Sequence, residues 1–283
     1  MTEVDSSTAE WQQWERRLTK IGAAVEAWQA RTNNAPTIPA KSALGGDDTP
    51  GLVVSNLAWY SLIVAVEHLD FVIACMRATS TMYPTAYMTT LRSALLSASH
   101  AVWVLSPVRR AGRRERAMRL QMQDLDDQLK MLRSVWGLSR EQETARESDI
   151  ANLDGQAEAN KAIVDRLGLL PASLAKLNNT DVVTAVAKQI HDDPIAASGV
   201  QLLWRTGSAA AHGQRSYATM RMNRNVLLTE GERKVMQLRG DLTHDVGPAA
   251  GAVTIAISEA FRLFDLRCGH VQDSERQVRF SDL

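Results

Sequence analysis

The chain has 283 residues, of which 45% are hydrophobic, so it can bury a sizeable core and is not intrinsically disordered. Its 32 basic and 32 acidic side chains cancel, which excludes attraction to nucleic acid or membrane by a whole-protein field and leaves only local patches. The two cysteines, Cys75 and Cys268, are too few for a disulfide framework or a cysteine zinc site. Such sparse cysteine use is typical of a reducing cytoplasm, where we expect the protein to be located.

The first predicted element is an amphipathic helix over about residues 8–31. The stretch MTEVDSSTAEW at its start carries acidic residues in place of the lysines and apolar run of an export signal. The apolar residues of the helix recur at spacings of three and four and share one stripe: Trp11, Trp14, Leu18, Ile21, Val25 and Trp28. We expect this stripe to pack on the body, on a second copy of the chain or on a protein partner.

The sequence divides into four segments. We assign residues 1–31 to the N-terminal helix, residues 32–51 to a linker, residues 52–270 to a helical bundle domain and residues 271–283 to a tail. The linker sequence, TNNAPTIPAKSALGGDDTPG, is rich in Pro, Gly, Asn and Asp and has no hydrophobic period, which is typical of a mobile connection.

Two long apolar helices are predicted at residues 52–79 and 85–105, and we expect them to form the central hairpin of the bundle. Tyr83-Pro84 separates them, because the residue before a proline disfavours the helical conformation. Charged residues interrupt the first helix, so it lacks the roughly 20 consecutive apolar residues of a membrane-spanning segment. We therefore predict a buried core helix and no membrane association.

Five polar side chains interrupt these two helices: Glu67, His68 and Asp70 in the first, and Arg92 and His100 in the second. Buried charges normally need partners, so we expect Arg92 to pair with Glu67 or Asp70 across the hairpin. Alternatively, the five side chains line a polar pocket. We expect no metal site, because the His-x3-His and Glu-x-x-His spacings are absent, and no cofactor, because there is no Gly-rich phosphate loop.

A fourth helix, predicted over residues 108–136, begins with an arginine cluster. The stretch RRAGRRERAMR contains six arginines and one glutamate, and cations at a helix N-terminus oppose the helix macrodipole unless anions offset them. RNA phosphates could supply those anions. The residues assigned to RNA binding are Arg109, Arg110, Arg113, Arg114 and Arg116. Alternatively, the cluster is a solvated face that pairs with acidic residues of its own helix or of the next helix.

The rest of the chain is also mostly helical. A charged outer helix is predicted at residues 139–167, a short helix at residues 179–191, a helix that starts at Asp193-Pro194, and a last helix at residues 243–268. The segments SYATMRMNR and KVMQLRG flank the turn-like TEGE and can form a short β-hairpin. The predicted class is therefore all-α, an up-and-down helical bundle with an extra N-terminal helix and this hairpin.

The helix that starts at Asp193-Pro194 carries the main candidate site, in the stretch LLWRTGSAAAHGQRSY. At about 3.6 residues per turn, Arg205, Ser208 and His212 lie on one face, with Gln201 one turn earlier. Arginine is a fixed cation suited to a phosphate, and histidine exchanges protons near neutral pH. Attack of a ribose 2′-hydroxyl on the adjacent phosphate requires these two functions and no metal.

A structural interpretation of the same residues stays open. Gly207 and the alanines at residues 209–211 allow close helix packing, and Arg205 and His212 could make ordinary hydrogen bonds at the edge of that contact.

The pattern Arg205-x6-His212, with Ser208 inside it and Gly213 after it, resembles the motif of the HEPN superfamily. It is most similar to uncharacterised bacterial members that carry a Ser and a His-Gly in this region. The resemblance implies an all-α bundle and, for members with an intact motif, a metal-independent ribonuclease or toxin whose cleft forms where two motif helices pair in a dimer. Other members keep the fold and only bind. Thr206 departs from the family, whose ribonucleases usually have a polar residue such as Asn after the arginine.

Two functions are therefore expected from the sequence. In the first, the protein is a homodimeric RNA endonuclease in which His212 is the general acid/base, Arg205 clamps the phosphate, Ser208 orients it, and the arginine cluster attracts RNA. In the second, it is a non-catalytic binding or scaffold protein that docks through its N-terminal helix.

Overall fold

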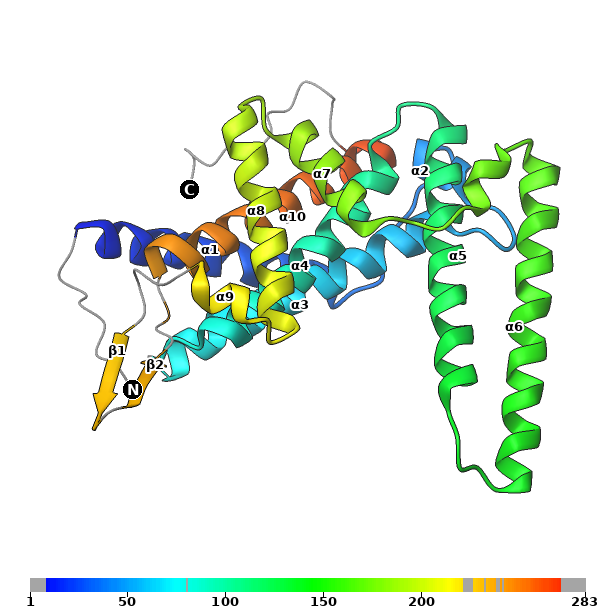
Figure 1. The fold of residues 1–283 in the computed structure, drawn as a ribbon. Coiled ribbons are helices and arrows are strands. Elements are labelled where there is room, and N and C mark those ends of the chain that lie inside the picture. Colours follow the sequence, from blue (N-terminus) through cyan, green and yellow to red (C-terminus); the bar gives the residue numbers. More distant parts are fainter. Residues whose placement is uncertain are drawn as a thin grey trace.

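The computed structural model describes residues 9–79, 81–220, 226–231, 233–237, 240 and 242–270. Over these residues the protein is an all-α helical bundle, as the sequence predicts (Figure 1). The helices are α1 (Ala9–Thr32), α2 (Ala43–Asp47), α3 (Val54–Thr79), α4 (Pro84–Leu105), α5 (Arg110–Ser134), α6 (Arg140–Leu167), α7 (Asn179–Ile190), α8 (Pro194–Ala211), α9 (Arg215–Thr219) and α10 (Gly247–Cys268). A 3-10 turn, η1 (Pro171–Leu174), and a π-helical turn, η3 (Leu242–Val246), complete them.

The centre of the bundle is the predicted hairpin of α3 and α4, along which α10 packs (Figure 1). Pro84 occupies the first turn of α4, where its missing N–H is not needed. Trp59 of α3 meets Phe264 of α10 with 4.9 Å between ring centroids. Because α10 is buried on nearly all sides, its first half, residues 247–257, has no charged residue on any face.

α3 is also the one described helix whose length and composition would allow it to cross a membrane. Half of its most apolar window is buried inside the protein, and a core helix of a soluble protein has the same composition. The property is therefore weak evidence for a membrane.

The apolar stripe of α1 packs within the chain, on α3, α10 and η3. Trp14, Ile21 and Val25 are buried, and Trp28 stacks on Phe261 with 5.9 Å between ring centroids. This confirms the predicted helix; the Trp11 side chain lies outside the described part. The described residues of the stripe pack within the chain, so α1 is part of the bundle.

The expected mobile linker at residues 32–51 instead packs onto the body, which corrects the prediction. Ser42 caps α2 by accepting a hydrogen bond from the Gly45 N–H at 3.0 Å, and Leu44 and Asp47 of α2 are fully buried. The polar, Gly-rich sequence of this segment reflects a tight turn and the buried carboxylate of Asp47. That carboxylate pairs with Arg113, far along the chain.

α5 and α6 form an antiparallel arm that projects from one end of the bundle, so the fold departs from a simple up-and-down bundle (Figure 1). The arm has its own small hydrophobic cluster of Leu125, Leu129 and Leu153. At its tip, the Trp136 side chain is 89% exposed.

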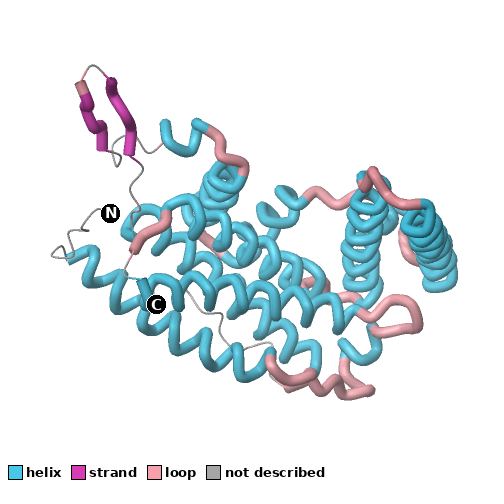
Figure 2. The backbone as a smooth tube through the Cα atoms, turned by 90° about the horizontal axis from the view of Figure 1, so that it is seen from below, coloured by secondary structure: helices cyan, strands magenta, loops and turns pink. Residues whose placement is uncertain are grey.

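Two short strands, β1 (Val226–Glu230) and β2 (Arg233–Gln237), pair antiparallel and lie apart from the helical body (Figure 2). The first strand is expected at residues 216–224, but residues 215–219 form α9, and residues 221–224 lie outside the described part of the chain. Tyr217 explains the difference, because its ring is buried and its hydroxyl donates to the Pro84 carbonyl at 2.8 Å. This tertiary anchor holds α9 in place despite the strand-like pattern of its sequence.

Candidate functional site

α8 begins and ends as its sequence dictates. The Asp193 side chain accepts a hydrogen bond from the Ile195 N–H at 2.9 Å, and Pro194 occupies the first turn. The helix ends at Ala211, His212 is its C-cap, and Gly213 takes the left-handed conformation at φ +60°. His212 therefore lies at the very end of the helix.

Close packing on α4 fixes which face of α8 points outward. A Cβ at Gly207 would lie 2.7 Å from the Arg92 Cβ and 2.9 Å from the Met88 carbonyl oxygen, so only glycine permits this approach. Trp204 is buried on the same side. The opposite side of α8 faces solvent.

The structure places Arg205 and His212 on that exposed side, with Ser208 half-buried between them in the sequence. Within the described part of the chain, neither the guanidinium nor the imidazole makes a hydrogen bond or ion pair. The structural interpretation required edge hydrogen bonds from these two groups, and the described residues supply none. Both groups are therefore available to a ligand.

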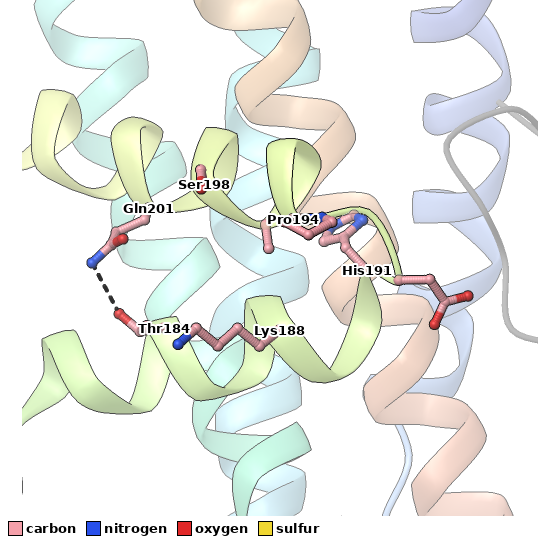
Figure 3. Close-up of a pocket in the computed structure, with 8 residues that line it drawn as sticks. Thr184, Lys188, His191, Pro194, Ser198 and Gln201 are labelled. Atoms are coloured by element: carbon pink, nitrogen blue, oxygen red, sulfur yellow. Dashed lines mark hydrogen bonds between the residues drawn. The ribbon is translucent and has the colours of Figure 1, made fainter.

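A cavity of about 310 Å³ lies between α7 and α8, next to this face (Figure 3). Its polar lining residues are Thr184, Lys188, His191, Asp192, Ser198 and Gln201. The Gln201 amide donates a hydrogen bond to the Thr184 hydroxyl oxygen at 3.2 Å and so joins the two walls. Burial lowers the pKa of His191, and the carboxylates of Asp193 and Asp192 partly offset that effect.

Sequence reasoning noted Gln201 and missed the rest of this cavity. Ser198 and Gln201 continue the Arg205, Ser208 and His212 face toward the start of α8, and this spacing could have revealed the α8 wall. The wall from α7 could not be found, because nothing in the sequence states that α7 packs there.

The expected polar pocket between α3 and α4 does not form. Glu67 is exposed, His68 Nδ1 lies 2.8 Å from the Val64 carbonyl oxygen of its own helix, and His100 Nε2 lies 3.1 Å from Asn179 Oδ1 of α7. Burial lowers the pKa of His100, and the Asn179 bond partly offsets this. His100 thus links α4 to α7 as a largely buried structural residue.

The predicted ion pair of Arg92 with Glu67 or Asp70 is also wrong. The guanidinium carbon of Arg92 lies 4.0 Å from the centroid of the Trp204 ring, in a cation–π contact, and no ion pair to Arg92 occurs among the described residues. Burial lowers the pKa of Arg92. The side chain lies on the α8 side of α4, out of reach of the α3 carboxylates.

The arginine cluster expected to bind RNA is mostly part of the fold. Arg113 is buried against Asp47, Arg114 donates to the Asp47 carbonyl oxygen at 2.8 Å, and Arg116 donates to the Trp103 carbonyl oxygen at 2.7 Å. Arg109 and Arg110 remain exposed. The offsetting acid comes from α2, not from the helices next to the cluster in sequence.

Among the described residues, no group of three His, Cys, Asp or Glu side chains could hold a metal ion. No family model, curated protein or solved structure matches this chain.

Proposed function

We propose that this protein is a HEPN-type, metal-independent RNA endonuclease of the cytoplasm whose active site lies on the exposed face of α8. The observation that carries the proposal is that Arg205 and His212 share this face, both are exposed, and neither is engaged by another described residue. A polar side chain buried for a structural role would need hydrogen-bond partners, whereas Arg205 and His212 are exposed and open to a ligand.

The proposed reaction needs one positive charge and two proton transfers. His212 accepts the proton of the ribose 2′-hydroxyl as its oxygen attacks phosphorus, and Arg205 stabilises the charge on the phosphorane. The bond from phosphorus to the 5′-oxygen then breaks, and that oxygen receives a proton. The products are a 2′,3′-cyclic phosphate end and a 5′-hydroxyl end.

A homodimer with α8 at its interface would supply the second proton-transfer group, because the twofold axis would then place two identical α8 helices side by side. The surface beside the motif supports such pairing, since Ile195 is 81% exposed and Leu202 is 60% exposed on α8. His212 of the second copy would protonate the leaving oxygen.

The test is cleavage of a mixed-sequence RNA in the presence of EDTA. His212→Ala removes a proton-transfer group typically worth about 10² to 10⁴ in rate, and Arg205→Ala weakens charge stabilisation. Neither change should lower the free energy of unfolding, because both side chains are exposed. His270→Ala and Arg140→Ala are matched controls, since both residues are exposed and lie outside α8. Absence of cleavage by the wild-type protein, or equal activity of all four variants, would overturn the proposal.

A second candidate function is a non-catalytic binding protein. The exposed side chains of Met131, Val135 and Trp136 near the tip of the α5–α6 arm favour it, because a group of neighbouring apolar side chains in water is typical of an interaction site. A wild-type protein that leaves RNA intact would give this second function precedence.

A further inference from the structure

The cavity between α7 and α8 continues the proposed active face. Ser198 and Gln201 line the cavity, and Arg205, Ser208 and His212 follow them on the same helix. At about 100° per residue these five positions fall within an arc of about 80°, and they span about 21 Å along the axis. A strand that contacts Arg205 can therefore reach the cavity along one face of α8.

The cavity offers hydrogen-bond donors and one cation at the end nearer Arg205. In Figure 3 the Lys188 ammonium lies beside Thr184, opposite Gln201. Among the described residues Lys188 has no ion pair, and the Ser198 hydroxyl has no hydrogen-bond partner. One amide hydrogen of Gln201 bonds to Thr184, and the other has no partner in the described part of the chain. Lysine, serine and glutamine side chains of this kind contact phosphate oxygens in nucleic-acid complexes.

The opposite end of the cavity has a different chemistry. His191 lies there beside Pro194, with Asp192 next in the chain (Figure 3). Because burial lowers the pKa of His191, the imidazole is neutral at neutral pH and Asp192 contributes the charge of this end. An imidazole nitrogen and a carboxylate can accept hydrogen bonds from sugar hydroxyls. The N-terminus of α8 offers few free N–H groups to a ligand in the cavity, because the Ile195 N–H already donates to the Asp193 side chain.

From these two ends we infer that the cavity is a subsite for one nucleotide of a single-stranded RNA, with a phosphate on Lys188, Ser198 and Gln201 and the ribose toward His191 and Asp192. The inference rests on the proposed function, because it places that nucleotide on the strand that Arg205 and His212 cleave. Its volume of about 310 Å³ is at the lower end of the range for small-ligand sites and has no room for a duplex.

The experiment measures binding of fluorescein-labelled decauridylate by fluorescence anisotropy, in EDTA and in the His212→Ala background, so that cleavage does not interfere. Adding Lys188→Ala should weaken binding by roughly tenfold, because a hydrogen bond to a charged group is lost. The slope of log affinity against log salt should fall by about 0.7, the value for one phosphate contact on a single strand. Lys188→Arg keeps the charge and should keep the slope.

Lys20→Ala is the matched control, since Lys20 is an exposed lysine on α1 with no ion pair among the described residues. Should Lys188→Ala behave like Lys20→Ala in affinity and in salt slope, the inference is overturned. It is equally overturned if uridine 5′-monophosphate displaces decauridylate at a similar concentration, because the ligand would then be a free nucleotide. Decauridylate binding through Lys188 by a protein that cleaves no RNA would overturn the proposed function alone and leave the subsite standing.

Discussion

Arg113 of α5 holds Asp47 of α2 through two hydrogen bonds, from Nε to Oδ2 at 2.5 Å and from Nη2 to Oδ1 at 2.8 Å. Both residues are buried, and Arg113 also donates to the carbonyl oxygens of Pro107 and Val108. A bidentate pair of this kind satisfies both charges inside the protein. It closes the segment before α3 onto the base of the α5–α6 arm.

Arg113→Ala is expected to lower the free energy of unfolding by about 3 to 5 kcal/mol, because it leaves the Asp47 carboxylate buried without its main partner. The measurement is urea denaturation followed by circular dichroism. Arg109→Ala removes an exposed arginine of the same cluster and should change the free energy by no more than about 0.5 kcal/mol. Equal values for the two variants would contradict the burial of this pair.

Gly207→Ala and Gly199→Ala should have opposite effects on stability although both lie within α8. At Gly207 the new Cβ would lie 2.9 Å from a backbone oxygen of α4, an overpacking that typically costs about 1 to 3 kcal/mol. At Gly199 no atom lies within 4 Å, so alanine should stabilise the helix by up to about 1 kcal/mol. Thermal melts of the two variants test this contrast, and an unchanged or higher melting temperature for Gly207→Ala would show that α8 is not packed closely on α4.

His100 should make the protein less stable in mild acid. Burial lowers its pKa in the folded state, so below a pH of about 6.5 the unfolded chain binds a proton that the folded protein does not. The contribution of His100 to the free energy of unfolding is therefore present above that pH and is lost as the pH falls toward the folded-state pKa. Urea denaturation at pH 7.5 and pH 5.5 should show a smaller loss for His100→Gln than for the wild type. His191, whose pKa is also lowered, accounts for part of the remaining loss. An unchanged pH dependence in the variant would contradict the burial of the His100 ring.

The two cysteines should react with a thiol reagent at very different rates. Burial raises the pKa of Cys268 to about 11, and the thiolate is the reactive form. At pH 8 only about one molecule in a thousand carries that thiolate. In a Cys75→Ser variant, Cys268 should therefore resist Ellman's reagent until denaturant is added. Rapid reaction of the folded Cys75→Ser variant would show that the Cys268 side chain at the end of α10 is accessible to solvent.

Local patterns predicted most helices of this fold. The three-and-four spacing of α1 and the Asp193-Pro194 start of α8 depend on neighbouring residues, so the sequence locates them to within a residue or two. The α2 segment was missed because its stability comes from Arg113, which is 66 positions away. Its own composition is typical of a loop.

In the candidate site, too, features set by neighbouring residues could be predicted and features set by distant residues could not. That Arg205 and His212 share a face of α8 follows from helix geometry and was predictable. The orientation of Arg92 toward Trp204 could not be predicted, because a charged residue on α4 can pair with a residue of either helix that packs beside it, α3 or α8. The α7 wall of the cavity likewise depends on how two helices meet.

The arm of α5 and α6 gives the protein two levels of stability. Its outer half is held by the three leucines of its own cluster and by exposed ion pairs such as Arg133 with Asp154, which contribute little. The bundle, by contrast, shares one large continuous core. The outer half of the arm can therefore open while the bundle stays folded, so its backbone amides exchange with solvent deuterium by local opening, long before those of α3, α4 and α10.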